Sequence, residues 1–337
     1  MSARRREAGV VLVLVLVFVL LLVSSIATFL RRAVLDATIV ENRDATARAE
    51  GLARGGVRLA TALLLEDRLR EASGLRVETR RDVWARVGSQ QPLVFGDDAE
   101  LRLRIQDAAA RLDLNALFEL GEVRDPATEV LLVALFERAV RDAGLADDPA
   151  HDPGDLARNL IDYVDADTVG LRGGFEDDYY QQQDPPYRAA NRPLLTLEEL
   201  ALVQGFDAAL VEALRPYVTV FPYVDAGGIN PNTAPPWVLG ILFHGTAGDY
   251  RFASADQAES LLRLREQGLL CHETADHPDC TALGEALPGE VYPPPSYVSE
   301  VFEVSAEARV GEIRRTVEAV IDRSSPSEPL VLSWRVW

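Results

Sequence analysis

The hydrophobic and polar positions of the chain change pattern along its length, and the first pattern predicts one long helix. No charged residue occurs from Val10 to Leu30, a run of 21 residues. As a helix this run is about 31 Å long, which is enough to cross the hydrocarbon core of a bilayer. Apolar residues then recur at helical spacing as far as Ser73-Gly74. We therefore expect a helix whose first half lies in a membrane and whose second half is amphipathic.

Three glycines interrupt the amphipathic half of this helix, at Gly51, Gly55 and Gly56. Each lowers helix stability by about 1 kcal/mol relative to alanine. Close packing of a sheet against the helix requires small residues, and we expect that packing to explain all three.

Two regions show the shorter alternation of half-buried strands. The first covers residues 75–107, with LRVETRRDVWARV at 75–87 and AELRLRIQDA at 99–108. The second closes the chain, with strands expected in 299–310, 312–323 and 330–337. Alternation with one polar face indicates a small antiparallel sheet.

About 180 residues between these two regions carry Leu and Ala at helical spacing, interrupted by Pro and Gly. That is too long and too regular for a loop. The predicted helical segments lie in 128–145, 156–166, 195–206, 208–218, 235–243 and 253–269. The predicted fold is α+β, a long N-terminal helix on an antiparallel sheet (31–113 and 291–337) with an inserted α-helical domain at 114–290.

The formal net charge of −19 limits the classes of partner. An acidic surface repels nucleic acid and favours cations or basic partners. The sequence also contains neither an HExxH nor a GxSxG pattern around its four histidines, His151, His244, His272 and His277. Paired acids alone do not exclude a hydrolase, but nothing singles out such a pair.

The two cysteines, Cys271 and Cys280, lie close together in CHETADHPDC. In a chain whose body is exported, such a pair indicates first a disulfide that closes a small loop. His272 and His277 lie between them, so a Cys2His2 zinc site is the alternative on ligand types. Its spacing matches none of the usual zinc patterns.

The boundary before the apolar run resembles a processing site. Arg4, Arg5 and Arg6 precede the run and hold the N-terminus in the cytoplasm if the segment is a plain anchor. The run is longer than a secretory h-region and lacks an A-x-A site. A short basic leader that ends in Gly9 directly before Val10 resembles type IV prepilins and pseudopilins. The resemblance implies that prepilin peptidase removes residues 1–9 and that residues 10–30 stay as the transmembrane part of the helix, with Val10 N-methylated.

Pilin-type helices usually carry Glu at the fifth mature position, and this chain has Leu14 there. A bare apolar residue fits a subunit with no neighbour above it. Motifs of the inserted region and one near the C-terminus then resemble the K-type minor pseudopilin of the type II secretion system, in the order of that family. They are Arg111–Asn115, Ile161–Asp167, Phe175–Tyr180, Tyr187–Pro193, LTLEELALVQG, Ile229–Pro235 and the closing Ser333-Trp334-Arg335.

The resemblance implies a non-enzymatic subunit at the tip of a periplasmic pseudopilus, above the I-type and J-type minor pseudopilins. The expected location is the bacterial inner membrane, single-pass, with the C-terminal body in the periplasm. The expected function is to initiate or cap the pseudopilus for protein export. A type IV pilus minor pilin is the alternative within the same class of protein.

Six carboxylates within 17 residues form the densest chemical feature, around the turn GLRGG. They are Asp162, Asp165, Asp167, Glu176, Asp177 and Asp178. Carboxylates this close repel one another unless a cation neutralises them, and calcium takes six to eight oxygen ligands from flexible loops. A solvated acidic loop is the alternative. The resemblance favours calcium, since the family binds it in this domain, and Asp165, Asp167, Asp177 and Asp178 are the preferred ligands.

The main rival function is a membrane-anchored, competence-type DNA-binding protein. LTLEELALVQGF and INPNTA resemble a helix–hairpin–helix module, which binds phosphates through backbone N–H groups. Such a module needs basic residues beside it, whereas Glu198, Glu199, Asp207 and Glu212 lie here. We therefore expect no nucleic-acid partner.

Overall fold

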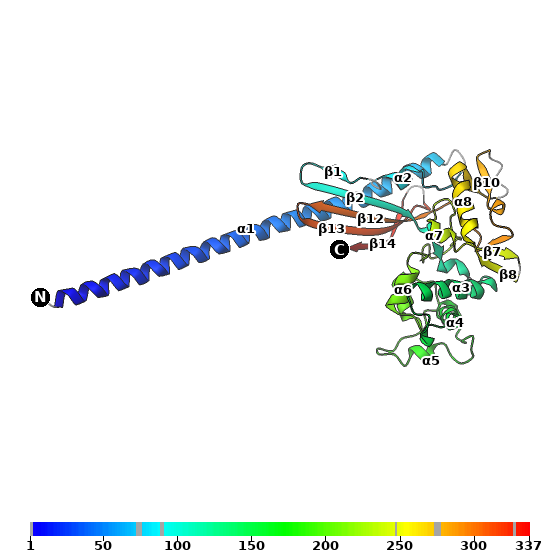
Figure 1. Cartoon of the computed structure of the whole chain (residues 1–337), viewed down its shortest axis with the longest axis horizontal. Coiled ribbons are helices and arrows are strands. Elements are labelled where there is room, and N and C mark those ends of the chain that lie inside the picture. The colour runs from blue at the N-terminus through cyan, green and yellow to red at the C-terminus, as the bar shows by residue number, and fades with distance from the viewer. Residues whose placement is uncertain (1–2, 72–75, 88–90, 247, 273–277, 326–327) are drawn as a thin grey trace.

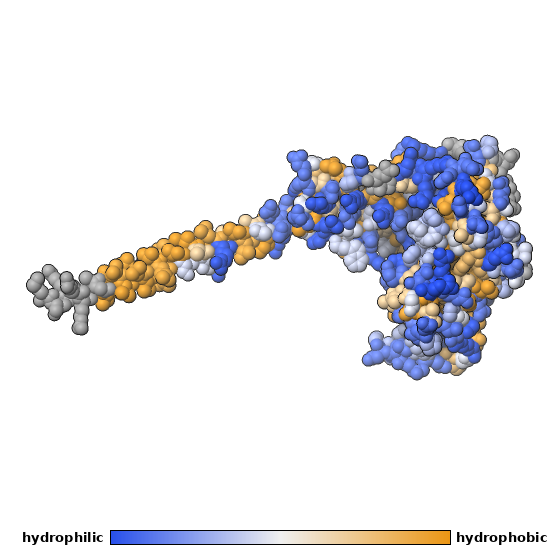
Figure 2. All heavy atoms as spheres, in the orientation of Figure 1, coloured by the Kyte–Doolittle hydropathy of each residue, from blue (hydrophilic) through white to orange (hydrophobic). Residues whose placement is uncertain are grey.

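A 69-residue helix, α1 (Ala3–Glu71), projects from the body of the protein (Figure 1). The computed structural model describes residues 3–71, 76–87, 91–246, 248–272, 278–325 and 328–337. From Val10 to Asp44 the side chains of α1 are exposed, and the first buried one is Ala49. The projecting half is strongly apolar (Figure 2), and α1 is the one helix of the described chain long and apolar enough to span a membrane. The predicted long helix is confirmed.

Five antiparallel strands form the main sheet in the order β1-β2-β12-β13-β14. The strands are β1 (Leu93–Phe95), β2 (Ala99–Asp107), β12 (Val301–Val310), β13 (Ile313–Asp322) and β14 (Leu330–Val336). β2 and β12 are neighbours although residues 108–300 separate them in the chain, with Asp107 opposite Phe302. Residues 108–300, called the inserted region below, therefore leave and re-enter the sheet at one place.

The second half of α1 covers one face of this sheet. Ala53, Val57, Ala60 and Leu64 recur at helical spacing and are all at most 2% exposed. Alternate residues of β2, β12 and β13 point toward them and complete a single core. The predicted alternation in 99–108, 299–310 and 312–323 is confirmed, because each strand buries one face beneath α1.

Of the three glycines in α1, close packing explains only Gly56. A Cβ at Gly56 would lie 2.9 Å from Cβ of Ala306 and 3.1 Å from Cδ1 of Leu101, whereas Gly51 and Gly55 face open space. The expectation for Gly51 and Gly55 was wrong, since both lie on the exposed side of α1.

Alanine substitutions should separate these glycines. Gly55→Ala should raise the free energy of unfolding by about 1 kcal/mol through helix propensity alone. Gly56→Ala gains the same propensity but overpacks the core at a cost of about 1–3 kcal/mol. We expect urea unfolding of the two variants to differ by about 2 kcal/mol, with Gly56→Ala the less stable. Equal stabilities would contradict the close contact with Ala306.

The strand predicted at 75–87 was wrong. Val83–Arg86 forms a short helix, α2, and residues 76–79 follow an irregular path. The alternation fails because Glu78, expected on a solvent face, is fully buried. Glu78 pairs with Arg323 and accepts a hydrogen bond from the indole N–H of Trp84 at 3.3 Å.

The inserted region is mainly helical but also contains small sheets that the periodicity did not predict. Its α-helices are α3 (Ala127–Asp142), α4 (Pro153–Val164), α5 (Asp177–Tyr180), α6 (Ala208–Leu214), α7 (Pro236–Leu239) and α8 (Ala255–Gln267). Its 3-10 helices are η1 (Ala108–Ala110), η2 (Leu114–Leu117), η3 (Pro149–His151), η4 (Leu197–Leu202) and η5 (Leu283–Glu285). The segments expected at 195–206 and 235–243 thus shorten to η4 and α7.

The short strands of the inserted region pair with one another. They are β3 (Leu112–Asp113), β4 (Phe118–Glu119), β5 (Glu122–Val123), β6 (Val218–Thr219), β7 (Phe243–Thr246), β8 (Asp249–Phe252), β9 (Leu269–Cys271), β10 (Cys280–Ala282) and β11 (Glu290–Tyr292). The pairs are β3 with β6, β4 with β5, β9 with β10, and the three-stranded sheet β11-β7-β8. A hydrophobic core separate from that beneath α1 holds these elements together.

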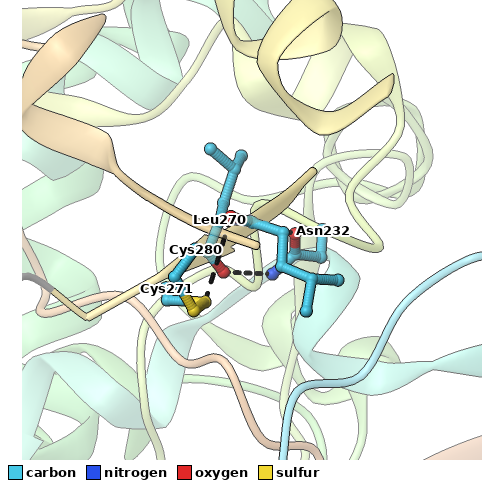
Figure 3. The surroundings of a disulfide bond; sticks show 5 residues. Asn232, Leu270, Cys271 and Cys280 are labelled. Atoms are coloured by element: carbon cyan, nitrogen blue, oxygen red, sulfur yellow. Dashed lines mark hydrogen bonds between the residues drawn. A yellow bond between two sulfur atoms is a disulfide. The ribbon is translucent and has the colours of Figure 1, made fainter. Parts of the chain in front are cut away.

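Cys271 and Cys280 form a disulfide between β9 and β10 (Figure 3). The disulfide prediction is confirmed, and the alternative zinc site was wrong because both sulfurs are bonded to each other; His277 lies outside the described residues. Asn232 holds the same strand: its Nδ2 donates to the Leu270 carbonyl at 2.7 Å, and its Oδ1 accepts from the Leu270 N–H at 2.9 Å.

Loss of this disulfide should cost about 2.7 kcal/mol. Its partners are 9 residues apart, and loop-closure entropy for a loop of about 10 residues gives that value at 25 °C. We expect Cys271→Ser with Cys280→Ser to lower the free energy of unfolding by this amount in urea. Reducing agent should lower wild type equally and leave the double variant unchanged. An equal response of both proteins would contradict the assignment.

Candidate metal centre

The acidic cluster lies at the end of the inserted region that carries α4 and α5 (Figure 1). Asp152 caps α4 by accepting from the N–H of Asp155 at 2.9 Å, and Pro153 occupies its first turn. These signals fix the start of a 12-residue helix, so Asp162 lies in its last turn and Asp165 is its C-cap. The negative end of the helix dipole therefore meets carboxylates, and no basic residue of α4 lies in that turn to offset them.

A tight loop returns the chain to this helix end. Val169 and Phe175 form an isolated antiparallel bridge, and Gly173 and Gly174 have φ of 82° and 94°. Positive φ is readily available to glycine, so the GLRGG turn can close here. The turn brings Glu176 back against Asp162 and Asp165.

Asp162, Asp165 and Glu176 form a group that could hold a metal ion. One carboxylate oxygen from each lies within 4.8 Å of the others. Calcium lies about 2.4 Å from its oxygen ligands, so two oxygens that share one ion are at most about 4.8 Å apart, and each pair in this group meets that limit. Oδ1 of Asp165 and Oε1 of Glu176 are buried and have no hydrogen-bond partner among the described residues. Buried oxygens of this kind are normally satisfied, so this donor set fits a hard cation.

The local electrostatics oppose three bare charges. Burial, then Asp167 and Asp162, raise the pKa of Asp165 to about 7. Burial and the neighbouring carboxylates also raise the pKa of Glu176 to about 8, and burial raises the pKa of Asp162. No arginine of the described chain lies within ion-pair distance of these three groups. Either protons or a cation must therefore neutralise part of the cluster.

The other three predicted ligands lie outside this set of three. Asp167 is exposed and accepts from the N–H of Val169 at 2.7 Å, although its charge contributes to the raised pKa values. Asp177 accepts from the N–H of Ala189 at 3.0 Å and lies 3.7 Å from Arg188. Asp178 is exposed on α5.

Asn191 belongs to the cluster but was not among the predicted site residues. Its Nδ2 donates to the Asp167 carbonyl and, at 3.4 Å, to Oε2 of Glu176. Asn191 therefore holds the two ends of the loop together. The one sequence signal for Asn191 was its place in the Tyr187–Pro193 motif. Its distance of 15 residues from Glu176 in sequence matches no regular spacing, so the sequence did not predict that the two side chains meet.

A second group of three carboxylates, Asp67, Glu78 and Asp82, also lies within 4.8 Å. Arg323 already pairs with two of its members: Nη1 lies 3.1 Å from Oδ2 of Asp67, and Nη2 pairs with Glu78. The guanidinium takes the place that a cation would need, so this group is an ion-pair cluster.

The segment that resembles a helix–hairpin–helix does not offer a phosphate site. Asp207 caps α6 by accepting from the N–H of Leu210 at 2.8 Å, so a carboxylate occupies the helix start. Arg215, at the end of α6, pairs with Glu212 at 2.9 Å and with Glu198 at 3.5 Å. A carboxylate at the helix N-terminus and a neutralised arginine both oppose DNA binding.

Comparisons with known proteins agree on one family. The family model for protein K of the type II secretion system matches residues 110–223. Protein K of Pseudomonas aeruginosa is 28% identical over 98% of this chain and 93% of its own length. The chain also resembles, at 22% identity and a TM-score of 0.61, a solved structure described as the GspK-GspI-GspJ complex from the enterotoxigenic Escherichia coli Type 2 Secretion System. That match covers 88% of this chain and 99% of the other, and it supports the α+β fold.

Protein K of Klebsiella pneumoniae is similar over a large share of both chains. It is 31% identical over 239 residues, which are 70% of this chain and 68% of the relative. The order of motifs from Arg111 to Arg335, the projecting apolar helix and the inserted region agree with this similarity. The chain belongs to the type II secretion system protein K family.

Proposed function

We propose that this protein is the minor pseudopilin at the tip of a type II secretion pseudopilus, and that its role is assembly. The observation that carries the proposal is the contrast between the two halves of α1. The half before Ala49 is exposed and largely apolar, while the half after it is packed on the sheet. An apolar helix that projects from a folded body can lie in a membrane and later pack against partner helices.

Prepilin peptidase would release residues 1–9 after Gly9 and leave Val10 as the first residue. The mature chain would remain in the inner membrane by one span, with its body in the periplasm. The disulfide between Cys271 and Cys280 supports an oxidising compartment for that body.

The I-type and J-type minor pseudopilins are the proposed partners. The similar solved structure is described as a complex of GspK with GspI and GspJ. Leu14 supports a position above them, because it offers no carboxylate to a further neighbour. We expect the full chain, co-expressed with both partners, to purify from membranes as a 1:1:1 complex. Recovery of this chain without them would contradict the proposed partnership.

The inserted region would initiate or cap the pseudopilus by occupying space where another subunit would add. It lies beyond the end of the sheet that is far from the N-terminus (Figure 1). The test replaces residues 108–301 with an Asn-Gly turn, since Asp107 and Phe302 are already antiparallel neighbours that a two-residue turn can join. We expect this variant to bind both partners but to allow longer pseudopili. Unchanged length with retained binding would contradict capping.

Calcium is the proposed structural cofactor of the acidic cluster. Asp162, Asp165 and Glu176 would hold it, supported by the two buried oxygens that lack partners. The ion would supply positive charge and leave the loop from Asp165 to Glu176 fixed on α4. Asn191 would keep the loop closed from its other side.

Calcium binding should weaken as pH falls. Because the pKa values of Asp165 and Glu176 are raised to about 7 and about 8, the ion-free fold holds protons that calcium must displace. Calorimetry in buffers of different ionisation enthalpy should show release of between about one and two protons at pH 7. In chelator, the contribution of these two groups to stability should be fully present below the ordinary carboxylate pKa and should be lost as pH rises through 7 to 8. Binding without proton release would contradict these values.

A further inference from the structure

A cleft of about 750 Å³ lies along β2, and residues from both faces of this strand line it. Its floor is β2, where Leu101, Leu103 and Ile105 point into the core beneath α1 and the alternate residues are exposed. Its walls come from the segment around α2 and from α7 in the inserted region. The residues that line the cleft include Arg80, Arg102, Arg104, Trp237 and Glu307.

The charge in this cleft is opposite to that of the molecule. The chain has a net charge of −19, yet Arg80, Arg102 and Arg104 are exposed and form no ion pair with any described residue. Glu307 lies opposite Arg102 in the strand register, but its carboxylate is 3.6 Å from Nε of Arg314. Three guanidinium groups thus have no carboxylate partner among the described residues, although the chain has an excess of acids.

The spacing of two of these arginines matches an extended peptide. Arg102 and Arg104 are two residues apart on one strand, so their Cα atoms are about 6.8 Å apart and both point to the same face. A peptide in extended conformation places alternate side chains at the same interval. Two carboxylates separated by one residue can therefore meet the two guanidiniums, each in a bidentate pair.

Trp237 supplies an apolar wall. Its side chain is 51% exposed, while its indole N–H already donates to the Pro216 carbonyl at 3.2 Å. With its polar atom satisfied inside the protein, the ring offers mainly apolar contact to a ligand. The buried carboxylate at the inner end of the cleft, Asp107, accepts from the Ala109 N–H at 2.8 Å, from Asn230 and from Thr233. These hydrogen bonds from within the protein occupy the carboxylate of Asp107.

We propose that this cleft binds an extended acidic segment of another polypeptide, with carboxylates at alternate positions and an apolar side chain against Trp237. A long polyanion such as nucleic acid would meet the repulsion of the acidic body beyond the cleft. A short segment with two carboxylates can pair with the arginines without reaching that acidic surface, and inside the cleft Glu307 already lies near Arg314. Recognition of acidic motifs by clustered arginines is a general mode of peptide binding.

The test uses the full chain in non-ionic detergent and a fluorescein-labelled peptide, Gly-Ser-Glu-Phe-Glu-Ser-Gly, followed by fluorescence anisotropy. We expect saturable binding with Kd below 1 mM that weakens as salt increases. Arg102→Gln with Arg104→Gln should weaken it at least tenfold, and Trp237→Ala severalfold. The matched control is Arg251→Gln with Arg263→Gln, which removes two exposed arginines on β8 and α8 and should change Kd less than twofold.

Several outcomes would overturn the proposal. They are no saturable binding below 1 mM, equal weakening by the two double variants, or equal affinity for the peptide with Gln in place of both Glu residues. Competition with the labelled peptide at constant ionic strength tests whether the cleft prefers other kinds of anion. If inorganic phosphate or a ten-residue oligothymidylate displaces the probe as well as unlabelled peptide does, the cleft is a general anion site or a nucleic-acid site. Melting temperatures of all variants within 2 °C of wild type would show that the comparison concerns binding.

Discussion

Arg323→Met should lower the free energy of unfolding by about 3–5 kcal/mol, although the residue lies in no predicted site. Arg323 is fully buried, and its guanidinium lies 4.5 Å from the centre of the Phe302 ring. It pairs with Glu78, which is also fully buried, and with Asp67 at 3.1 Å. Removing the cation leaves a buried carboxylate without compensation, and this explains a cost of that size.

The position of Arg323 explains why the effect should extend beyond one ion pair. Its Nη1 also donates to the Leu64 carbonyl of α1 at 2.9 Å, and its Nε donates to the Ser299 carbonyl at 3.3 Å. One side chain therefore joins the end of α1, the segment around Glu78 and the chain entering β12. We expect hydrogen exchange to increase at all three places in the variant.

A double-mutant cycle separates the charge from the packing. Glu78→Gln in the Arg323→Met background should restore part of the lost stability, because it removes the uncompensated charge. Arg314→Met is the matched control on β13, the strand that ends just before Arg323. Arg314 is exposed and lies 3.6 Å from Glu307, so its loss should cost less than about 1 kcal/mol. If Arg323→Met lowers the free energy of unfolding no more than this control does, the buried ion pairs of Arg323 do not contribute more to stability than an exposed pair.

Sequence patterns predicted those parts of the fold in which one face of an element is buried. In β2, Leu101, Leu103 and Ile105 face α1 while Arg102 and Arg104 face outward, so the alternation has a direct physical cause. Where burial depends on a distant partner, local pattern fails. The segment around Glu78 alternates like a strand, but Arg323, 245 residues away in sequence, draws its carboxylate into the interior.

The candidate metal site shows the same division between local and distant causes. Asp162 and Asp165 are three residues apart at the end of α4, so helix geometry places them on one side. Residues 176–178 are consecutive acids, and neighbours in a helical turn point about 100° apart. Only one of the three can face the cluster, and the GLRGG turn selects Glu176. Sequence alone fixes the number of acids but not which one faces inward.

Calcium should stabilise the protein by about 3 kcal/mol when its free concentration is about 100-fold above Kd. Asp165→Asn with Glu176→Gln should abolish this gain, since it removes two of the three ligands. In chelator the same variant should be as stable as wild type or slightly more stable. Asn and Gln carry no charge, so the variant removes the charge repulsion and the cost of burying charge that raise both pKa values. Thermal unfolding of the full chain in detergent, with calcium and with chelator, measures both effects.

The matched control is Asp177→Asn with Asp178→Asn, which removes the same charge from the adjoining turn. Because neither residue belongs to the group of three, this variant should keep the calcium-dependent gain nearly intact. A gain that survives in Asp165→Asn with Glu176→Gln but disappears in the control would move the site to α5 and its neighbours. If calcium does not stabilise the wild type, bound protons must neutralise the cluster instead. The pKa values of about 7 and about 8 would then make this end of the inserted region less stable as pH rises through that interval.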